Sequence, residues 1–110
     1  MTATQARLQR VATELARKYG FELDDEINLN WHDDPELPQE LYFYVKFNDA
    51  EVDDIVQQAD IPVFLSISEH GVRFDVDSTP VAEHDKNDKF SRRSVNAAKR
   101  FIVENYAAFV

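Results

Sequence analysis

The sequence predicts an α+β protein of two layers, an antiparallel four-stranded sheet with helices on one face. Three observations predict this class. Amphipathic helical patterns stand at both ends of the chain, four runs of alternating apolar and polar residues lie between them, and short loops join these runs. The expected order is α-β-β-α(short)-β-β-α, and 110 residues fit a single globular domain, 1–110, with one core.

The first helix is predicted from apolar residues that recur at steps of three and one between Leu8 and Tyr19. Arg17 and Lys18 stand in its last turn, where cations complement the helix dipole. Gly20 follows, and glycine readily adopts the left-handed conformation that ends many helices. We therefore expect this helix to end immediately before Gly20.

Two strands and a short helix come next. Residues 27–31 and 41–47 alternate between apolar and polar side chains, as half-buried strands do. Residues 32–38 contain two prolines, which interrupt a hydrogen-bonded ladder, so this segment is predicted to be a turn. The pair Asn48–Asp49 then offers the N-cap of a helix about two turns long.

A hairpin and a last helix complete the predicted fold. Residues 61–67 and 72–76 both alternate, and a short loop that contains Gly71 joins them. The segment 78–89 is polar and has no pattern, so it is predicted to be a mobile loop. Ser91 is the expected N-cap of a final helix, whose apolar stripe runs to the end of the chain.

Acidic residues are concentrated in the middle of the chain. Between Gly20 and Asp85 there are 18 Asp and Glu residues against only Lys46 and Arg73, a net charge of −16. The two flanks hold the other ten Lys and Arg and three acidic residues, a net charge of +7. Segregated charge produces a directional field that attracts oppositely charged partners. The sequence therefore favours a basic protein partner and disfavours nucleic acid, whose phosphates require Lys and Arg. The alternative is that the carboxylates only form a solvated surface that keeps the protein soluble.

Composition excludes several classes of protein. The chain has no cysteine, so it forms neither a disulfide framework nor a thiolate metal site. Its two glycines are isolated, which excludes glycine-rich phosphate-binding loops. No apolar stretch approaches the roughly 20 residues that span a bilayer, and the first residues lack the apolar segment of a secretory signal. We expect a cytoplasmic protein that has no membrane contact.

One face of the predicted sheet is a candidate binding site. If the aliphatic rows face the helices, Tyr42, Tyr44 and Phe64 lie on the opposite face. Polar residues that include Arg73 and Asp75 surround them. Rigid aromatic side chains supply contact area at low entropic cost, which is typical of recognition surfaces. The alternative is that these rings only cover the sheet.

A basic cluster precedes the final helix. Lys89, Arg92 and Arg93, with Lys86 nearby, stand where backbone N–H groups and the helix dipole favour anions. Lys89, Arg92 and Arg93 therefore form a candidate anion-binding site. The alternative is that carboxylates of the same chain neutralise them.

The three histidines, His32, His70 and His84, do not form a metal-binding pattern. No two of them have the spacing of zinc ligands, and no calcium-loop pattern occurs. No serine stands in a glycine-flanked nucleophile elbow. We therefore expect no metal, no cofactor and no catalytic residue.

These features predict a small, acidic, non-catalytic interaction module of inhibitor, immunity or regulatory type that acts on a basic partner. One alternative is a small-molecule binding protein or enzyme that uses the face around Tyr42, Tyr44 and Phe64, with His32 or Asp75 as a polar anchor. A second alternative is a homodimer formed through that face. The candidate binding residues are Tyr42, Tyr44, Phe64, His32, Arg73, Asp33, Asp34, Asp53 and Asp54.

Overall fold

The computed structural model describes residues 3–30, 40–85 and 89–109, without the side chains of residues 25–30 and 85. The order of helices and strands is close to the predicted one, with one additional strand. They are α1 (Ala3–Tyr19), β1 (Phe21–Asn30), β2 (Glu40–Phe47), α2 (Ala50–Ala59), β3 (Val63–Ser68), β4 (Gly71–Val76), β5 (Thr79–Asp85) and α3 (Arg92–Tyr106), with a 3-10 turn at Ala107–Phe109.

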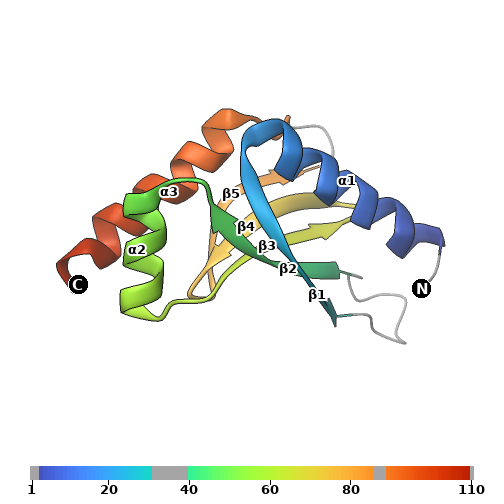
Figure 1. Cartoon of the computed structure of the whole chain (residues 1–110). Helices are drawn as coiled ribbons and strands as arrows, with labels where there is room; N and C mark the ends of the chain where they lie inside the picture. The colour runs from blue at the N-terminus through green and yellow to red at the C-terminus, as the bar shows by residue number, and fades with distance from the viewer. Residues whose placement is uncertain (1–2, 31–39, 86–88, 110) are drawn as a thin grey trace.

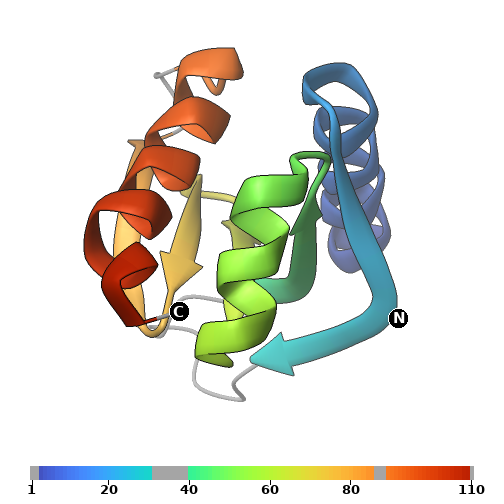
Figure 2. The same cartoon turned by 60° about the vertical axis from the view of Figure 1, so that its left-hand side comes forward.

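The strands form an antiparallel meander in the order β1-β2-β3-β4-β5. The three helices lie on one side of this sheet, and no described helix covers its other face, which is called the open face below (Figure 1). Helix α1 packs on β1, β2 and β3, while α3 packs on β4 and β5. Helix α2 packs against α3 and β2, as a second view of the chain also shows (Figure 2). The predicted α+β class, with helices packed on an antiparallel sheet, is confirmed.

The sheet has five strands, and the prediction of four was wrong. Strand β5 occupies most of the segment 78–89, where the sequence predicts a mobile loop. Asp77 and Ser78 both have positive φ, 48° and 69°, and they form a tight turn between β4 and β5. Among the described strands, β5 pairs with β4 alone. It carries Pro80, and its pairing with β4 is irregular near Ala82, whose φ is 54°. An edge strand of this kind has no clear period for sequence analysis to detect.

Strand β1 begins earlier than predicted, at Phe21 instead of Ile27. Its pairing with β2 shifts register between Leu23 and Ile27, where three successive carboxylates at residues 24–26 interrupt the alternation. The irregularity lets both halves of the strand pair with β2 although no single alternating pattern covers them. The turn predicted at 32–38 lies outside the described residues.

One continuous core fills the space between the sheet and the helices. Phe74 of β4 is fully buried, and its ring centroid lies 5.5 Å from the rings of Phe21, Phe47 and Phe90. These rings come from β1, β2 and the segment before α3, so the cluster joins distant parts of the chain. The core also holds Leu8, Ala12, Leu41, Leu65, Val76, Val95, Ala98 and Ile102.

The helix ends follow the predicted chemistry. Gly20 has φ of 77°, and its N–H donates to the carbonyl of Ala16 at 3.0 Å. Asp49 is the N-cap of α2, and its carboxylate accepts from Val52 N at 3.2 Å. Asp60 ends α2 in the left-handed conformation, a position the sequence does not reveal because most such residues are glycine.

The start of α3 is fixed by a reciprocal pair of serines. Ser91 is the N-cap, as predicted, and its N–H donates to Ser94 Oγ at 3.1 Å. Ser94 Oγ also lies 2.7 Å from His84 Nε2 of β5, so one buried hydroxyl joins the helix to the edge strand.

Replacement of Ser94 with alanine is expected to lower the free energy of unfolding by about 1–2 kcal/mol, because it removes one half of the capping box and the partner of His84. Urea denaturation followed by circular dichroism measures this loss. The Ser91→Ala/Ser94→Ala double variant should lose less than the sum of the single losses, since the two serines form one unit. Strict additivity would contradict this description of the cap.

Candidate functional site

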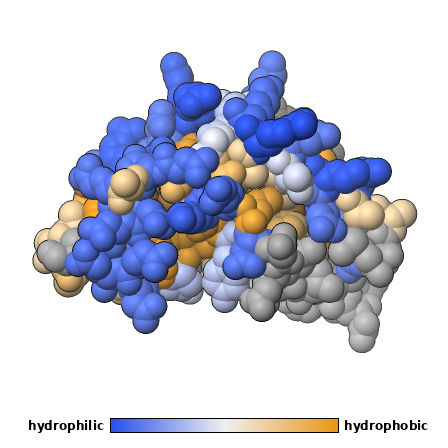
Figure 3. Space-filling view, in the orientation of Figure 1, coloured by the Kyte–Doolittle hydropathy of each residue, from blue (hydrophilic) through white to orange (hydrophobic). Residues whose placement is uncertain are grey.

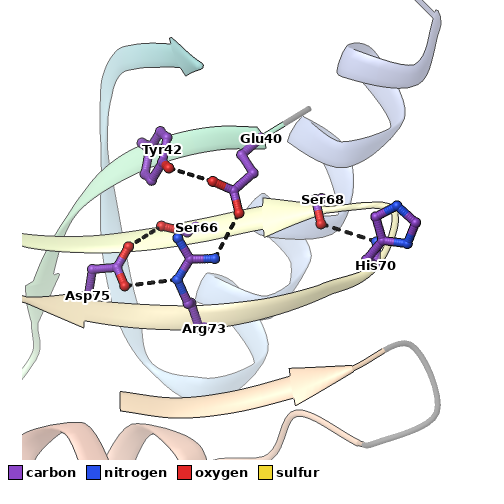
Figure 4. A network of polar contacts seen from close by, with 7 residues as sticks. All are labelled: Glu40, Tyr42, Ser66, Ser68, His70, Arg73 and Asp75. Carbon is purple, nitrogen blue, oxygen red and sulfur yellow. Dashed lines mark hydrogen bonds and ion pairs between the residues drawn. The ribbon is translucent and has the colours of Figure 1, made fainter. Parts of the chain in front are cut away.

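A polar network crosses the open face of the sheet (Figure 4). Arg73 of β4 donates from Nη1 to Glu40 Oε1 of β2 at 2.7 Å and from Nε to Asp75 Oδ1 at 2.9 Å. Ser66 of β3 donates to Asp75 Oδ2 at 2.7 Å. The hydroxyl of Tyr42 donates to the second carboxylate oxygen of Glu40. Because β3 separates β2 from β4, these bonds fasten three strands together on their open side.

The strand register explains why these side chains meet. Ser66 pairs with Tyr42 on one side and with Arg73 on the other. Two long side chains therefore flank a short one and cover it, and Ser66 is 1% exposed although no helix packs on this face. Asp75 is also buried, and the hydrogen bonds from Ser66 and Arg73 stabilise its charge away from water.

The guanidinium of Arg73 is hydrogen-bonded to two carboxylates of this network. Its hydrogen bond with Glu40 is the largest cause that raises the pKa of Arg73 above its usual value, and Asp75 adds to the effect while partial burial opposes it. Arg73 is therefore charged throughout the pH range in which proteins are handled. Together with Glu40 and Asp75 it forms an ion triad, a name used below for these three residues, with a formal charge of −1.

Aromatic rings lie beside the ion triad. Phe64 of β3 lies between two tyrosines of β2, with its centroid 4.4 Å from Tyr44 and 6.1 Å from Tyr42. The Tyr42–Phe64 pair is edge-to-face, and Tyr44 remains 39% exposed. The structure thus brings together Tyr42, Tyr44, Phe64 and Arg73 as the sequence predicts, on the face that no helix covers.

A depression of about 420 Å³ opens on this face. Its walls combine the rings of Tyr42 and Phe64 with two members of the ion triad, Arg73 and Asp75, and with the turn that leads into β5. The lining residues are Tyr42, Phe64, Arg73, Asp75, Ser78 and Pro80. Ser78 and Pro80 belong to the segment predicted as a loop, so sequence analysis could not assign them to the site.

The acidic surface of α2 is a second candidate. Glu51 and Asp53 lie in its first turn, where the helix dipole stabilises carboxylates, and Asp54 follows them. Asp54 accepts a hydrogen bond from Gln58 at 2.8 Å. Within the described part of the chain, Glu51, Asp53, Asp54 and the C-cap Asp60 make no ion pair. Figure 3 shows the hydrophilic outer surface over α2 and α3 on the left of the molecule.

The basic terminal helices neutralise this middle section at only a few points. Arg7 of α1 pairs with Glu69 at 2.7 Å, where both side chains are more than half exposed. Lys99 of α3 lies 3.6 Å from Asp49, the N-cap of α2. In the described residues these are the ion pairs that join a terminal helix to the acidic section. Neither of them involves Glu51, Asp53 or Asp54 of α2.

The turn between β4 and β5 links the acidic helix to the open face. The N–H of Asp77 donates at 2.9 Å to the carbonyl of Pro62, which lies two residues beyond the C-cap Asp60. Tyr106 at the end of α3 donates to Asp77 Oδ2 at 3.3 Å. Partial burial raises the pKa of Tyr106, and the charge of Asp77 adds to the shift. Acidic side chains thus continue from α2 around this end of the sheet toward the depression.

The predicted anion-binding residues are exposed at the start of α3. Lys89, Arg92 and Arg93 make no ion pair with a carboxylate among residues 3–30, 40–85 and 89–109 whose side chains are described. The first turn of α3 contains no acidic residue. Lys86 lies outside the described residues, so the predicted cluster is seen only in part.

The other predicted side chains are either elsewhere or not described. His32, Asp33 and Asp34 lie outside the described residues, and His70 lies in the β3–β4 turn, where its N–H donates to Ser68 Oγ at 3.1 Å. Across the residues that the structure places, no group of three His, Asp or Glu side chains is arranged to hold a metal ion.

The alternation of β3 predicts that Ser66 lies on this face, but it does not reveal the bond to Asp75, and no pattern places Glu40 in the network. Glu40 precedes the alternating run of β2, and its partner Arg73 is 33 residues away in sequence. The alternation of Arg73 and Asp75 did place those two on one face. No sequence signal shows that Glu40 reaches across a whole strand to Arg73.

Comparison with protein-family models, with curated proteins and with solved structures finds no match to this chain. In the part of the chain that the structure describes, every helix is too short or too polar to cross a lipid bilayer. The site therefore has to be interpreted from its own geometry.

Proposed function

We propose that this protein is a non-catalytic protein–protein interaction module whose partner is basic. The observation that carries the proposal is the group of carboxylates on α2 and at its C-cap, Glu51, Asp53, Asp54 and Asp60, none of which forms an ion pair with a described cation. Carboxylates that are not held in ion pairs project a negative potential that steers a basic protein and speeds its association. An inhibitor, an immunity protein or a regulator would use such a surface.

The geometry of the open face supports this function over small-molecule binding. Ligand sites are usually concave, mostly apolar and able to enclose most of the ligand. The depression beside Phe64 is open to solvent, and the charged groups of Arg73 and Asp75 that line it are already hydrogen-bonded within the ion triad. A catalytic role would require a nucleophile or base that is free to react. On the described open face, Asp75 and Ser66 are both buried and are hydrogen-bonded to each other.

The proposal is tested by affinity capture from a native lysate with two matched variants. Glu51→Gln/Asp53→Asn/Asp54→Asn neutralises α2, and Glu14→Gln/Glu83→Gln/Glu104→Gln removes the same charge from exposed positions elsewhere. The captured protein should be basic, should be lost when salt rises from about 0.05 M to about 0.5 M, and should be lost in the α2 variant alone.

Capture that is unchanged by salt, or reduced equally in both variants, would overturn the proposal. Thermal denaturation checks that both variants fold, because the first-turn carboxylates contribute about 0.3–1 kcal/mol each to α2 through the dipole. Sedimentation equilibrium of the bait alone tests the alternative of a homodimer through Tyr42, Tyr44 and Phe64. A monomer at high concentration would remove that alternative.

A further inference from the structure

The two outer strands of the sheet, β1 and β5, differ in how their edges are built. Among the described strands, each pairs with one neighbour only, so each has a row of backbone N–H and C=O groups with no described strand beside it. On β5 this row is interrupted, because Pro80 has no N–H and Ala82 takes a positive φ of 54°. Natural sheets use such features to prevent another chain from adding a strand. β5 is therefore a poor acceptor for a further strand.

Strand β1 lacks these interruptions of the backbone. It runs for 10 residues, Phe21–Asn30, and contains no proline, so every residue keeps its N–H donor. It is drawn in front of the other strands in Figure 1, with no described helix or strand between it and the viewer. β1 therefore presents a long backbone edge that a partner can reach.

The irregularity in β1 protects this edge by charge. The pairing with β2 shifts between Leu23 and Ile27, where residues 24–26 are all acidic. The strand also contains Glu22, and it has no basic residue. A proline excludes every incoming strand, whereas acidic residues exclude only a strand of like charge. A second copy of β1 is disfavoured because acidic residues would lie opposite acidic residues, and a basic strand is favoured.

We propose that an extended, basic segment of the partner adds to the five-stranded sheet as a further strand along the outer edge of β1. This inference rests on the proposed function and names the way in which the partner binds. Main-chain hydrogen bonds to β1 supply the affinity, and pairing of Lys or Arg with the acidic residues of β1 sets the choice of partner. Helix α2 packs against β2, the neighbour of β1, so the same partner can also meet the carboxylates of α2.

The test adds acetyl-Lys-Val-Lys-Val-Lys-Val-Lys-amide to the ¹⁵N-labelled full chain and follows the hydrogen exchange of its backbone amides. Alternate N–H groups of an edge strand face outward, and they exchange with water until a partner strand binds them. At saturation the peptide should slow exchange at alternate residues of β1 by about tenfold. Exchange in β5 should not change. The absence of any slowing in β1 would overturn the proposal.

A control peptide separates strand addition from attraction by charge alone. Acetyl-Lys-Pro-Lys-Pro-Lys-Pro-Lys-amide has the same charge, but its prolines cannot donate to a ladder and they favour polyproline II. It should leave the exchange of β1 unchanged. Equal slowing by both peptides would overturn strand addition, and slowing in β5 instead of β1 would overturn the assignment of the edge.

The choice of a basic strand is tested by a variant of β1. Glu22→Gln/Asp25→Asn/Glu26→Gln lowers the charge of the strand and should weaken binding of the Lys-Val peptide by about tenfold. The control variant of the lysate capture, which removes the same charge from exposed positions elsewhere, should weaken binding by about twofold at most. Unchanged exchange in β3 and β4 shows that both variants are folded. Equal weakening in the two variants would overturn the role of the acidic residues of β1.

The outcome is separable from that of the proposed function. If lysate capture depends on α2 while the Lys-Val peptide leaves β1 unchanged, strand addition is wrong and the interaction module stands. If capture does not depend on α2 at all, the proposed function fails whatever the peptide does.

Discussion

Replacement of Phe74 with alanine is expected to lower the free energy of unfolding by about 3–5 kcal/mol, the largest loss for a single substitution in this chain. Phe74 is fully buried and contacts the rings of Phe21, Phe47 and Phe90 at centroid distances of 5.5 Å. Removal of its ring leaves a cavity where three other rings lose their neighbour, and packed interiors relax only in part. Urea denaturation followed by tyrosine and tryptophan fluorescence measures the loss.

Phe109→Ala is the matched control for this prediction. The chemical change is the same, but Phe109 is 75% exposed at the end of the chain. Its effect should stay within about 0.5 kcal/mol. If Phe74→Ala fails to fold, Phe74→Leu keeps most of the volume and should still show a measurable loss. Equal effects at positions 74 and 109 would contradict the observed core.

Replacement of Arg73 with methionine is expected to cost about 1–3 kcal/mol, because it leaves the carboxylates of Glu40 and Asp75 close together without their cation. The loss should be smaller than for a fully buried pair, since the side chain of Arg73 is 28% exposed and water screens it in part. The midpoint of urea denaturation at neutral pH measures it.

The triple variant Glu40→Gln/Arg73→Met/Asp75→Asn separates lost attraction from uncompensated charge. It removes all three charges at similar volume, and it should recover most of the stability lost in Arg73→Met alone. Arg73→Lys should fall between the wild-type protein and Arg73→Met, because lysine keeps the charge but lacks the fork that reaches two carboxylates. A triple variant less stable than Arg73→Met would show that the bonds themselves, and not charge balance, dominate.

The ion triad also determines how the open face can function. It fixes Tyr42 through Glu40, and Tyr42 in turn packs against Phe64. A face whose rings are held before a partner arrives loses less conformational freedom on binding. The same substitution, Arg73→Met, therefore disturbs both the stability of the sheet and the arrangement of the rings on this face.

The class of fold could be predicted because local pattern and tertiary packing agree in most elements. The stripe of α1, the alternation of β2 and the caps at Gly20, Asp49 and Ser91 are all visible within a few residues of sequence. Strand β5 could not be predicted, since an edge strand with Pro80 and a positive φ at Ala82 needs only one paired neighbour. The first half of β1 could not be predicted either, because the carboxylates at residues 24–26 interrupt the alternation.

The amino-acid sequence by itself determined the segregation of charge, the aromatic residues of one sheet face and the order of all elements but one. These properties depend on composition and on periods of two and 3.6 residues, which need no knowledge of distant contacts. Only the tertiary structure decided that Arg73 binds Glu40 across β3 and that Ser78 and Pro80 complete a depression beside Phe64. Such contacts depend on strand register, which is set by packing between residues far apart in the chain.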